Sequence, residues 1–169
     1  MNETTTLSRL NADIELRVLA IRASYPQWPC GKGCAGCCRR LADVPQLTAA
    51  EWSLLQEGLA TLPAERLVEI HRDLTALADR GEHTIVCSLL DLSTNACPVY
   101  AHRPVACRSY GFYVQRNKGL YCADIEAQVA DGIMDDVVWG NHDAIDHRLA
   151  DLGEARPLSD WLARWESGK

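Results

Sequence analysis

The sequence predicts a mainly α-helical domain with a small irregular β hairpin, arranged around a cysteine-rich loop system in its middle. Three observations predict this fold class. Apolar residues recur at three- and four-residue steps in several segments, which is the periodicity of an amphipathic helix. Between those segments the periodicity is lost, and glycine, proline and cysteine are frequent. The chain also lacks the alternation of strands and helices that is typical of a parallel α/β sheet.

The first predicted helix covers residues 4–24. It ends before Tyr25-Pro26, because a proline disfavours helical backbone in the residue that precedes it. Its apolar face consists of Leu7, Leu10, Ile14, Val18 and Ile21. Charged residues interrupt the segment, whereas a secretory signal needs ~7–15 uninterrupted apolar residues. We therefore expect an amphipathic helix in a cytoplasmic protein.

Two further helices are predicted from their end signals. One begins at Thr48, because Thr48 and Glu51 have the spacing of a capping box. The next has Pro63 as its first residue and runs to Gly81, which is a suitable C-terminal cap.

The remaining segments are predicted to be less regular. Residues 25–38 form a tight loop rich in glycine and proline, and residues 84–90 look like a short buried strand. Residues 111–116 form one arm of a hairpin that turns at 117–119. Helical periodicity returns after Asn141. The apolar residues of the two C-terminal helices are Ile145, Leu149, Leu152, Trp161, Leu162 and Trp165.

Length and composition fit a single globular domain over residues 1–169. Apolar residues make up 47% of the chain and charged residues 24%, which argues against disorder. No segment approaches the ~20 uncharged residues of a membrane span. The 17 Lys and Arg against 23 Asp and Glu give a formal net charge of −6, which disfavours binding to a phosphate backbone or an anionic membrane. We therefore expect neither nucleic acid nor a membrane as a partner.

Eight cysteines are the anomaly of this composition. A domain of this length does not need disulfides to fold, and in a reducing cytosol closely spaced cysteines are more often metal ligands or redox groups. Four of them form a first cluster: Cys30, Cys34, Cys37 and Cys38. Glycines at positions 31, 33 and 36 let the backbone curl, so that several thiolates can approach within ~2.3 Å of one metal ion.

The other four cysteines are more widely spaced: Cys87, Cys97, Cys107 and Cys122. Cys87 alone is compatible with ordinary core packing. Cys97 and Cys107 bracket a run with two prolines, in which Arg103 and Arg108 lie near the sulfurs. Nearby cations offset thiolate charge and lower the thiol pKa, so these preorganised thiols suit a metal.

This pattern resembles that of the YkgJ-type cysteine-cluster proteins, described as a zinc- or iron-chelating domain. The family combines a CxxCxxCC cluster, a C-x-F-L segment, a C-x-x-Y-x-x-R-P-x-x-C-R segment and a late cysteine. Residues 30–122 carry the corresponding parts: Cys30 to Cys38, Cys87-Ser-Leu-Leu, Cys97 to Arg108, and Cys122. Here the first spacing is three residues rather than two, and Leu89 stands in place of the phenylalanine. The resemblance implies that all eight cysteines are metal ligands, with Cys30 the one that departs from the pattern.

The type of ligand does not identify the metal, because four thiolates suit both zinc and an iron–sulfur cluster. The cysteine pattern is also similar to that of flagellin lysine methylases, which are associated with an iron–sulfur cluster, and this similarity favours iron over zinc. Five histidines are further candidate ligands: His71, His83, His102, His142 and His147. Among them His102 is favoured, since it lies in the loop between Cys97 and Cys107. His71 is expected at the core or its boundary, and His142 and His147 in solvent.

Other functions stay open on the sequence alone. Zinc could hold a loop that binds another protein through Trp139, Trp161 and Trp165, although we expect these three to pack in the core. A metal-dependent enzyme or accessory protein related to the flagellin lysine methylases is a second alternative. A dithiol at Cys34 and Cys37 is a third, but thioredoxin-like motifs sit in a βαβ unit that the chain lacks. Whether the protein is an enzyme is open. For metal binding we expect the greatest sensitivity at five positions: Cys34, Cys37, Cys38, Cys97 and Cys107.

Overall fold

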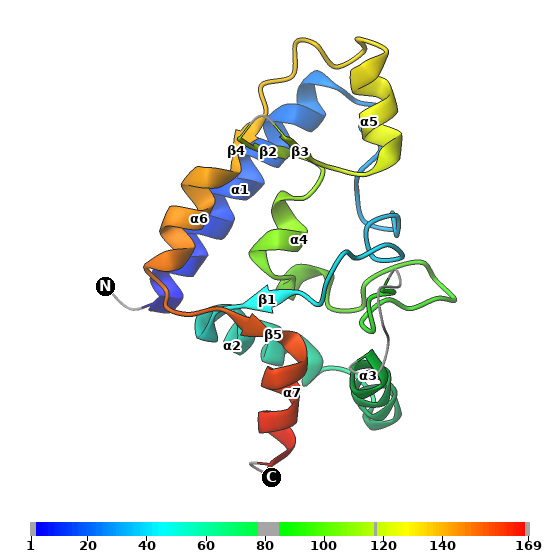
Figure 1. The fold of residues 1–169 in the computed structure, drawn as a ribbon, viewed down its shortest axis with the longest axis vertical. Helices are drawn as coiled ribbons and strands as arrows, with labels where there is room; N and C mark the ends of the chain where they lie inside the picture. The colour runs from blue at the N-terminus through cyan, green and yellow to red at the C-terminus, as the bar shows by residue number, and fades with distance from the viewer. Residues whose placement is uncertain (1–2, 78–84, 117, 168–169) are drawn as a thin grey trace. The chain divides into compact units, whose positions relative to one another are not determined.

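The computed structural model describes residues 3–77, 85–116 and 118–167 (Figure 1). The chain divides into two compact units, each formed by two separate stretches. Unit 1 contains residues 1–31 and 105–153, and unit 2 contains residues 32–104 and 154–169. The fold is mainly α-helical with small sheets, as the sequence predicts.

Unit 1 is built on the N-terminal helix, α1 (Glu3–Ser24). All five residues of its predicted apolar stripe are buried. Helix α6 (His142–Ala150) runs beside α1 in Figure 1, and α4 (Val105–Ser109) also contacts α1. Helix α5 (Ala123–Ala130) completes the helices of this unit among the described residues and buries Ile125.

A three-stranded sheet lies in the same unit. Strand β2 (Tyr113–Gln115) pairs antiparallel with β3 (Lys118–Leu120) and parallel with β4 (Gly140–Asn141). The β2–β3 pair confirms the predicted hairpin; position 117 of its turn lies outside the described residues.

Unit 2 combines helices with one short strand pair. Strand β1 (Gln46–Leu47) pairs antiparallel with β5 (Arg156–Pro157), next to α2 (Ala49–Leu59) and α7 (Leu158–Ser167) in Figure 1. The other elements are α3 (Ala64–Leu77) and the 3-10 helix η1 (Tyr100–His102).

Helix α2 begins where its capping box predicts. The Thr48 hydroxyl accepts a hydrogen bond from the Glu51 amide, and a Glu51 carboxylate oxygen accepts one from the Thr48 amide at 2.9 Å. These bonds satisfy two of the amides that a helix N-terminus leaves without intrahelical partners. Helix α3 begins at Ala64, one residue after the predicted first residue Pro63, and its predicted cap at Gly81 lies outside the described residues.

The C-terminal tryptophans pack against the core of unit 2. Trp161 stacks on Trp52 with ring centroids 6.0 Å apart, and its indole N–H donates to the Leu47 carbonyl at 2.9 Å. Trp165 meets Trp52 edge-on at 5.8 Å. Both side chains are half-buried and pack against the core of unit 2 from its edge.

The predicted buried strand at residues 84–90 is wrong in the part that is described. Ile85 forms only an isolated bridge with Leu41, Val86 is 41% exposed, and a turn follows. The amide of Cys87 donates to the Cys38 carbonyl at 2.7 Å, so the segment pairs with the first cysteine loop rather than with a sheet.

No helix in the described ranges combines the length and the apolar character that a bilayer span needs.

Candidate metal centre

Four cysteines of unit 2 lie close together: Cys37, Cys38, Cys87 and Cys97, called here the thiol cluster. The sulfur atoms of Cys37 and Cys38 are 4.0 Å apart. The Cys87 amide donates to the Cys38 carbonyl at 2.7 Å, and the Cys87 thiol and the charges of Cys87 and Cys97 raise the pKa of Cys38. Cys97 in turn interacts electrostatically with Cys37. Two segments that are distant in sequence therefore bring their thiols into one region.

Crowding and burial make these thiols hard to ionise. The contact with Cys38, followed by burial, raises the pKa of Cys37 far above its ordinary value. For Cys38 the contact with Cys37 lowers the pKa, but the contact with Cys87, burial and the charges of Cys87 and Cys97 outweigh it and raise the pKa to about 12. Adjacent thiolates repel one another, and a bound cation would relieve that repulsion.

At Cys97, nearby groups partly offset the effect of burial on the thiol pKa. Burial raises the pKa of its thiol, while the Val99 amide and the positive charge of Arg103 lower it. Arg103 is held by Tyr100, whose carbonyl accepts from Nε at 2.8 Å and whose ring lies 3.3 Å from the guanidinium carbon. Arg103 therefore offsets part of the rise in pKa that burial causes at Cys97.

The loop between Cys87 and Cys97 is shaped by Asp91. One carboxylate oxygen of Asp91 accepts hydrogen bonds from the Ser93 amide at 2.8 Å and the Ser93 hydroxyl at 2.7 Å. These bonds, with one from the Thr94 amide, hold the pKa of Asp91 at about 2. The loop closes through a bridge between Asp91 and Ala96, directly before Cys97.

Arg66 of α3 holds the other end of this loop. Its Nη2 donates to the carbonyls of Ser88 at 2.9 Å and Leu90 at 3.0 Å, immediately after Cys87. Its Nη1 pairs with Glu69 at 2.9 Å. A charged donor thus anchors the backbone next to Cys87 to a helix.

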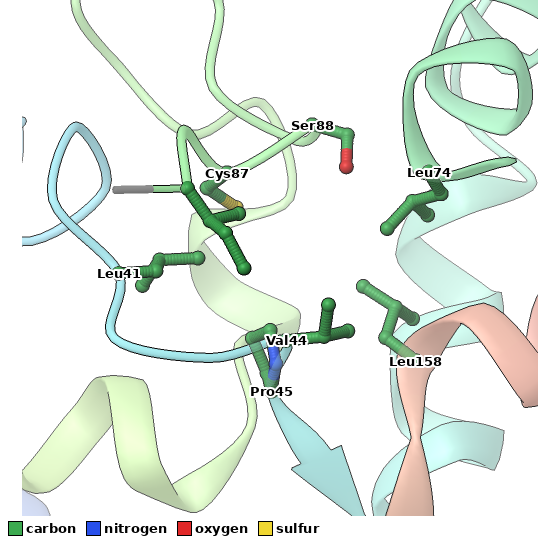
Figure 2. A pocket seen from close by; sticks show the side chains of 8 residues that line it. Leu41, Val44, Pro45, Leu74, Cys87, Ser88 and Leu158 are labelled. Carbon is green, nitrogen blue, oxygen red and sulfur yellow. The ribbon is translucent and has the colours of Figure 1, made fainter. Parts of the chain in front are cut away.

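The wall behind Cys87 is apolar (Figure 2). Its sulfur lies beside a small cavity of about 10 Å³, room for one water molecule at most. The cavity is lined mainly by Leu41, Val44, Pro45, Leu74 and Leu158, which Figure 2 shows around it. An apolar wall limits water access to a thiol site and tunes the groups that it holds.

The fifth cysteine of unit 2 is placed differently. Cys34 is exposed, whereas the members of the thiol cluster are half-buried. Gly33 next to it has φ +92°, a left-handed backbone that side chains with a Cβ rarely adopt, and of the three glycines in this loop it alone has a positive φ.

Three predicted ligands belong to unit 1: Cys30, Cys107 and Cys122. The Cys30 thiol donates to the Tyr110 carbonyl at 3.7 Å and lies against Gly111. Cys107 is on α4, and Cys122 is the N-cap residue of α5 with no hydrogen bond from its side chain to the helix. All three are half-buried.

None of the four described histidines forms a metal-holding group with the thiol cluster. His102, the favoured candidate, packs its ring on α2, where a Cβ at Gly58 would lie only 2.8 Å from the ring. His142 is half-buried and 3.2 Å from Asp146, so its predicted solvation is wrong; His147 is exposed and His71 half-buried, as expected. His83 lies outside the described residues.

The four thiols suit a metal by donor type. An all-sulfur set fits zinc or iron, and no disulfide joins the eight cysteines. Among the residues that the structure describes, no three Cys, His, Asp or Glu side chains form a group that could hold a metal ion.

A family model matches residues 29–128, the stretch that carries all eight cysteines. The model is named CxxCxxCC and described as "Putative zinc- or iron-chelating domain". The chain belongs to the CxxCxxCC family. This membership supports metal binding as the property of the domain, with zinc or iron as the metal. Comparisons with curated proteins and with solved structures found no match.

Two features of this CxxCxxCC domain were missed from the sequence. Arg66 lies in a helix far from any cysteine in sequence, and no local signal marks it as an anchor of the Cys87 loop. Gly58 is a glycine inside a predicted helix, a position that costs ~1 kcal/mol relative to alanine and usually has a packing reason. That reason is the ring of His102.

Proposed function

We propose that the protein binds iron or zinc through the thiol cluster, with Cys37, Cys38, Cys87 and Cys97 as the first set of ligands. The observation that carries this proposal is the proximity of thiols from two separate segments of unit 2. Membership in the CxxCxxCC family supports the same chemistry. Binding would draw the four sulfurs closer together and displace their protons.

Iron is the metal that we favour. The similarity of the cysteine pattern to that of flagellin lysine methylases supports it, and four thiolates are the usual ligands of an iron–sulfur cluster. When bound, such a cluster would supply electron transfer, whereas zinc would supply structural stability. The closely spaced cysteines, which no disulfide joins, also support a cytoplasmic location, since a reducing compartment keeps thiols available as ligands.

The remaining cysteines are proposed from the family pattern. Cys34, Cys107 and Cys122 match it, and their role is either a second site or an extension of the first. Cys30 departs from the pattern in spacing, and its thiol already donates to the Tyr110 carbonyl. We therefore use Cys30→Ser as the matched thiol control.

The test is metal content and absorbance after anaerobic purification. We expect at least one equivalent of metal in the parent protein. A brown protein with visible charge-transfer bands would establish iron–sulfur, and a colourless protein with bound zinc would establish zinc. Serine variants of the thiol cluster should lose most of the metal, while Cys30→Ser keeps it. If all four variants bind as the parent does, the proposed ligands are wrong.

A further inference from the structure

A surface pocket of unit 1 has none of the eight cysteines among its lining residues and has no role in the proposed function. It is lined by the turn that ends α1 and by the end of α5 with the loop after it. Tyr25 and Trp28 supply aromatic walls, with ring centroids 6.0 Å apart. Ile133 and Met134 also line the pocket. Ile133 is 60% exposed, so an apolar side chain forms the lip of the pocket.

The size of the pocket limits what it can hold. Its volume is about 200 Å³. A dry cavity of ~150 Å³ accommodates benzene, and pockets for drug-sized molecules start at ~300 Å³. The pocket therefore fits one aromatic ring or one branched aliphatic side chain, and it is too small for a nucleotide-sized cofactor.

Trp28 adds a polar feature to this apolar wall. The residue is nine-tenths buried, and its indole N–H has no hydrogen-bond acceptor within the described part of the chain. A buried donor without a partner costs ~1–3 kcal/mol. The rest of the side chain is held firmly, because its ring contacts Phe112 at 5.7 Å and Trp139 at 5.4 Å.

The α5 end and following loop that line one part of the pocket are acidic, while the Arg22 guanidinium near the other part donates to the Cys30 carbonyl and lies over the Phe112 ring. Residues 123–136 contain five Asp and Glu and no Lys or Arg. All five are exposed: Asp124, Glu126, Asp131, Asp135 and Asp136. The residues that line the pocket itself carry no charge. An apolar pocket beside an acidic segment is complementary to an apolar side chain flanked by cations.

We propose that this pocket binds one apolar or aromatic side chain of a basic segment of a partner protein. The side chain would sit between Trp28 and Ile133, and flanking lysines or arginines would face the acidic residues at 131–136. Single aromatic side chains in desolvated pockets commonly dominate such interfaces, while the charged rim governs association rate and selectivity.

The probe is a synthetic peptide with one phenylalanine between two pairs of lysines. Binding is measured on the full-length protein by calorimetry and by the indole ¹H–¹⁵N resonance of Trp28. Ile133→Ser should weaken binding by at least ~tenfold. The control is Val138→Ser, which removes an apolar side chain of similar exposure outside the pocket and should leave binding unchanged. Asp131→Asn with Asp135→Asn should weaken binding several-fold and reduce its salt dependence.

Three outcomes would overturn the proposal. The first is absence of binding at millimolar peptide. The second is equal binding by peptides in which the lysines are replaced by glutamates or the phenylalanine by alanine. The third is binding of N-acetylphenylalanine amide as tight as that of the peptide, which would assign the pocket to a small molecule. None of these outcomes bears on metal content, so this proposal and the proposed function fail independently.

Discussion

Replacing Arg66 should loosen the backbone beside Cys87 more than any other part of unit 2. Arg66→Met keeps most of the aliphatic stem and removes the guanidinium, which donates to the Ser88 and Leu90 carbonyls. Hydrogen bonds from a charged donor contribute ~1.5–3 kcal/mol each. Both bonds come from one nitrogen, and the side chain is 23% exposed, so water can reach part of the vacated space. We expect a total loss of about 2–3 kcal/mol.

The assay has a global and a local measurement. Urea denaturation reports the free energy of unfolding, for which the loss corresponds to a fall in melting temperature of about 4–12 °C in a chain of this length. Mass-mapped alkylation reports the local effect, and Cys87 should react faster in the variant under native conditions. The matched control is Arg72→Met, because Arg72 is 71% exposed and pairs only with its neighbour Asp73 among the interactions that the structure gives it. An exposed pair of this kind contributes ~0–1 kcal/mol.

Two results would refute the reasoning. One is an Arg66→Met protein whose unfolding free energy lies within ~0.5 kcal/mol of the Arg72→Met protein, the range of ordinary surface substitutions. The other is a loss of stability without faster alkylation of Cys87, which would mean that Arg66 stabilises α3 rather than the loop.

Three further predictions concern the cysteines. The pKa of Cys38 is raised to about 12 from an ordinary 9.0, so the protonated Cys38 thiol stabilises the metal-free protein below pH 9, and this stabilisation is lost as the pH rises toward 12. Cys38→Ser should therefore flatten the dependence of the urea midpoint on pH. An unchanged slope would contradict this prediction. In Gly111→Ala the backbone has φ +88° and the new Cβ would lie only 2.9 Å from the Cys30 sulfur, so the free energy of unfolding should fall by more than ~2 kcal/mol. Gly153→Ala has a similar φ of +94° but open space around the Cβ, and it should cost ~1–2 kcal/mol. Equal losses of stability in thermal unfolding would exclude a clash at Gly111. Removal of metal by a chelator should leave the helical circular dichroism signal largely intact, while amide hydrogen exchange becomes faster in both loops that carry the thiol cluster. If the amides of these loops stay protected from exchange, metal does not order the loops.

Local signals predicted much of the secondary structure. The capping box of Thr48 and Glu51 and the apolar stripe of α1 depend on contacts within one or two helical turns, so residue spacing is enough to reveal them. The hairpin at β2 and β3 is equally local. Short helices gave weaker signals, because α4 has only five residues and α5 buries only Ile125.

The error at residues 84–90 has a different origin. A short apolar segment forms a strand only if a partner strand is available, and the periodicity of the segment itself carries no information about a partner. Here the amide of Cys87 bonds to the carbonyl of Cys38 in a loop, and the turn after it is held by Arg66. Both partners are distant in sequence.

The eight cysteines, their spacing and the motif of the CxxCxxCC family can be found without a structure, because residue types and short spacings are local properties. Which thiols lie near one another depends on the folded chain. Cys37 and Cys38 lie beside Cys87 and Cys97, whereas the thiol of Cys30 turns to the Tyr110 carbonyl. The physical reason is that these neighbours are set by backbone hydrogen bonds and packing between segments far apart in the chain, which no local pattern encodes.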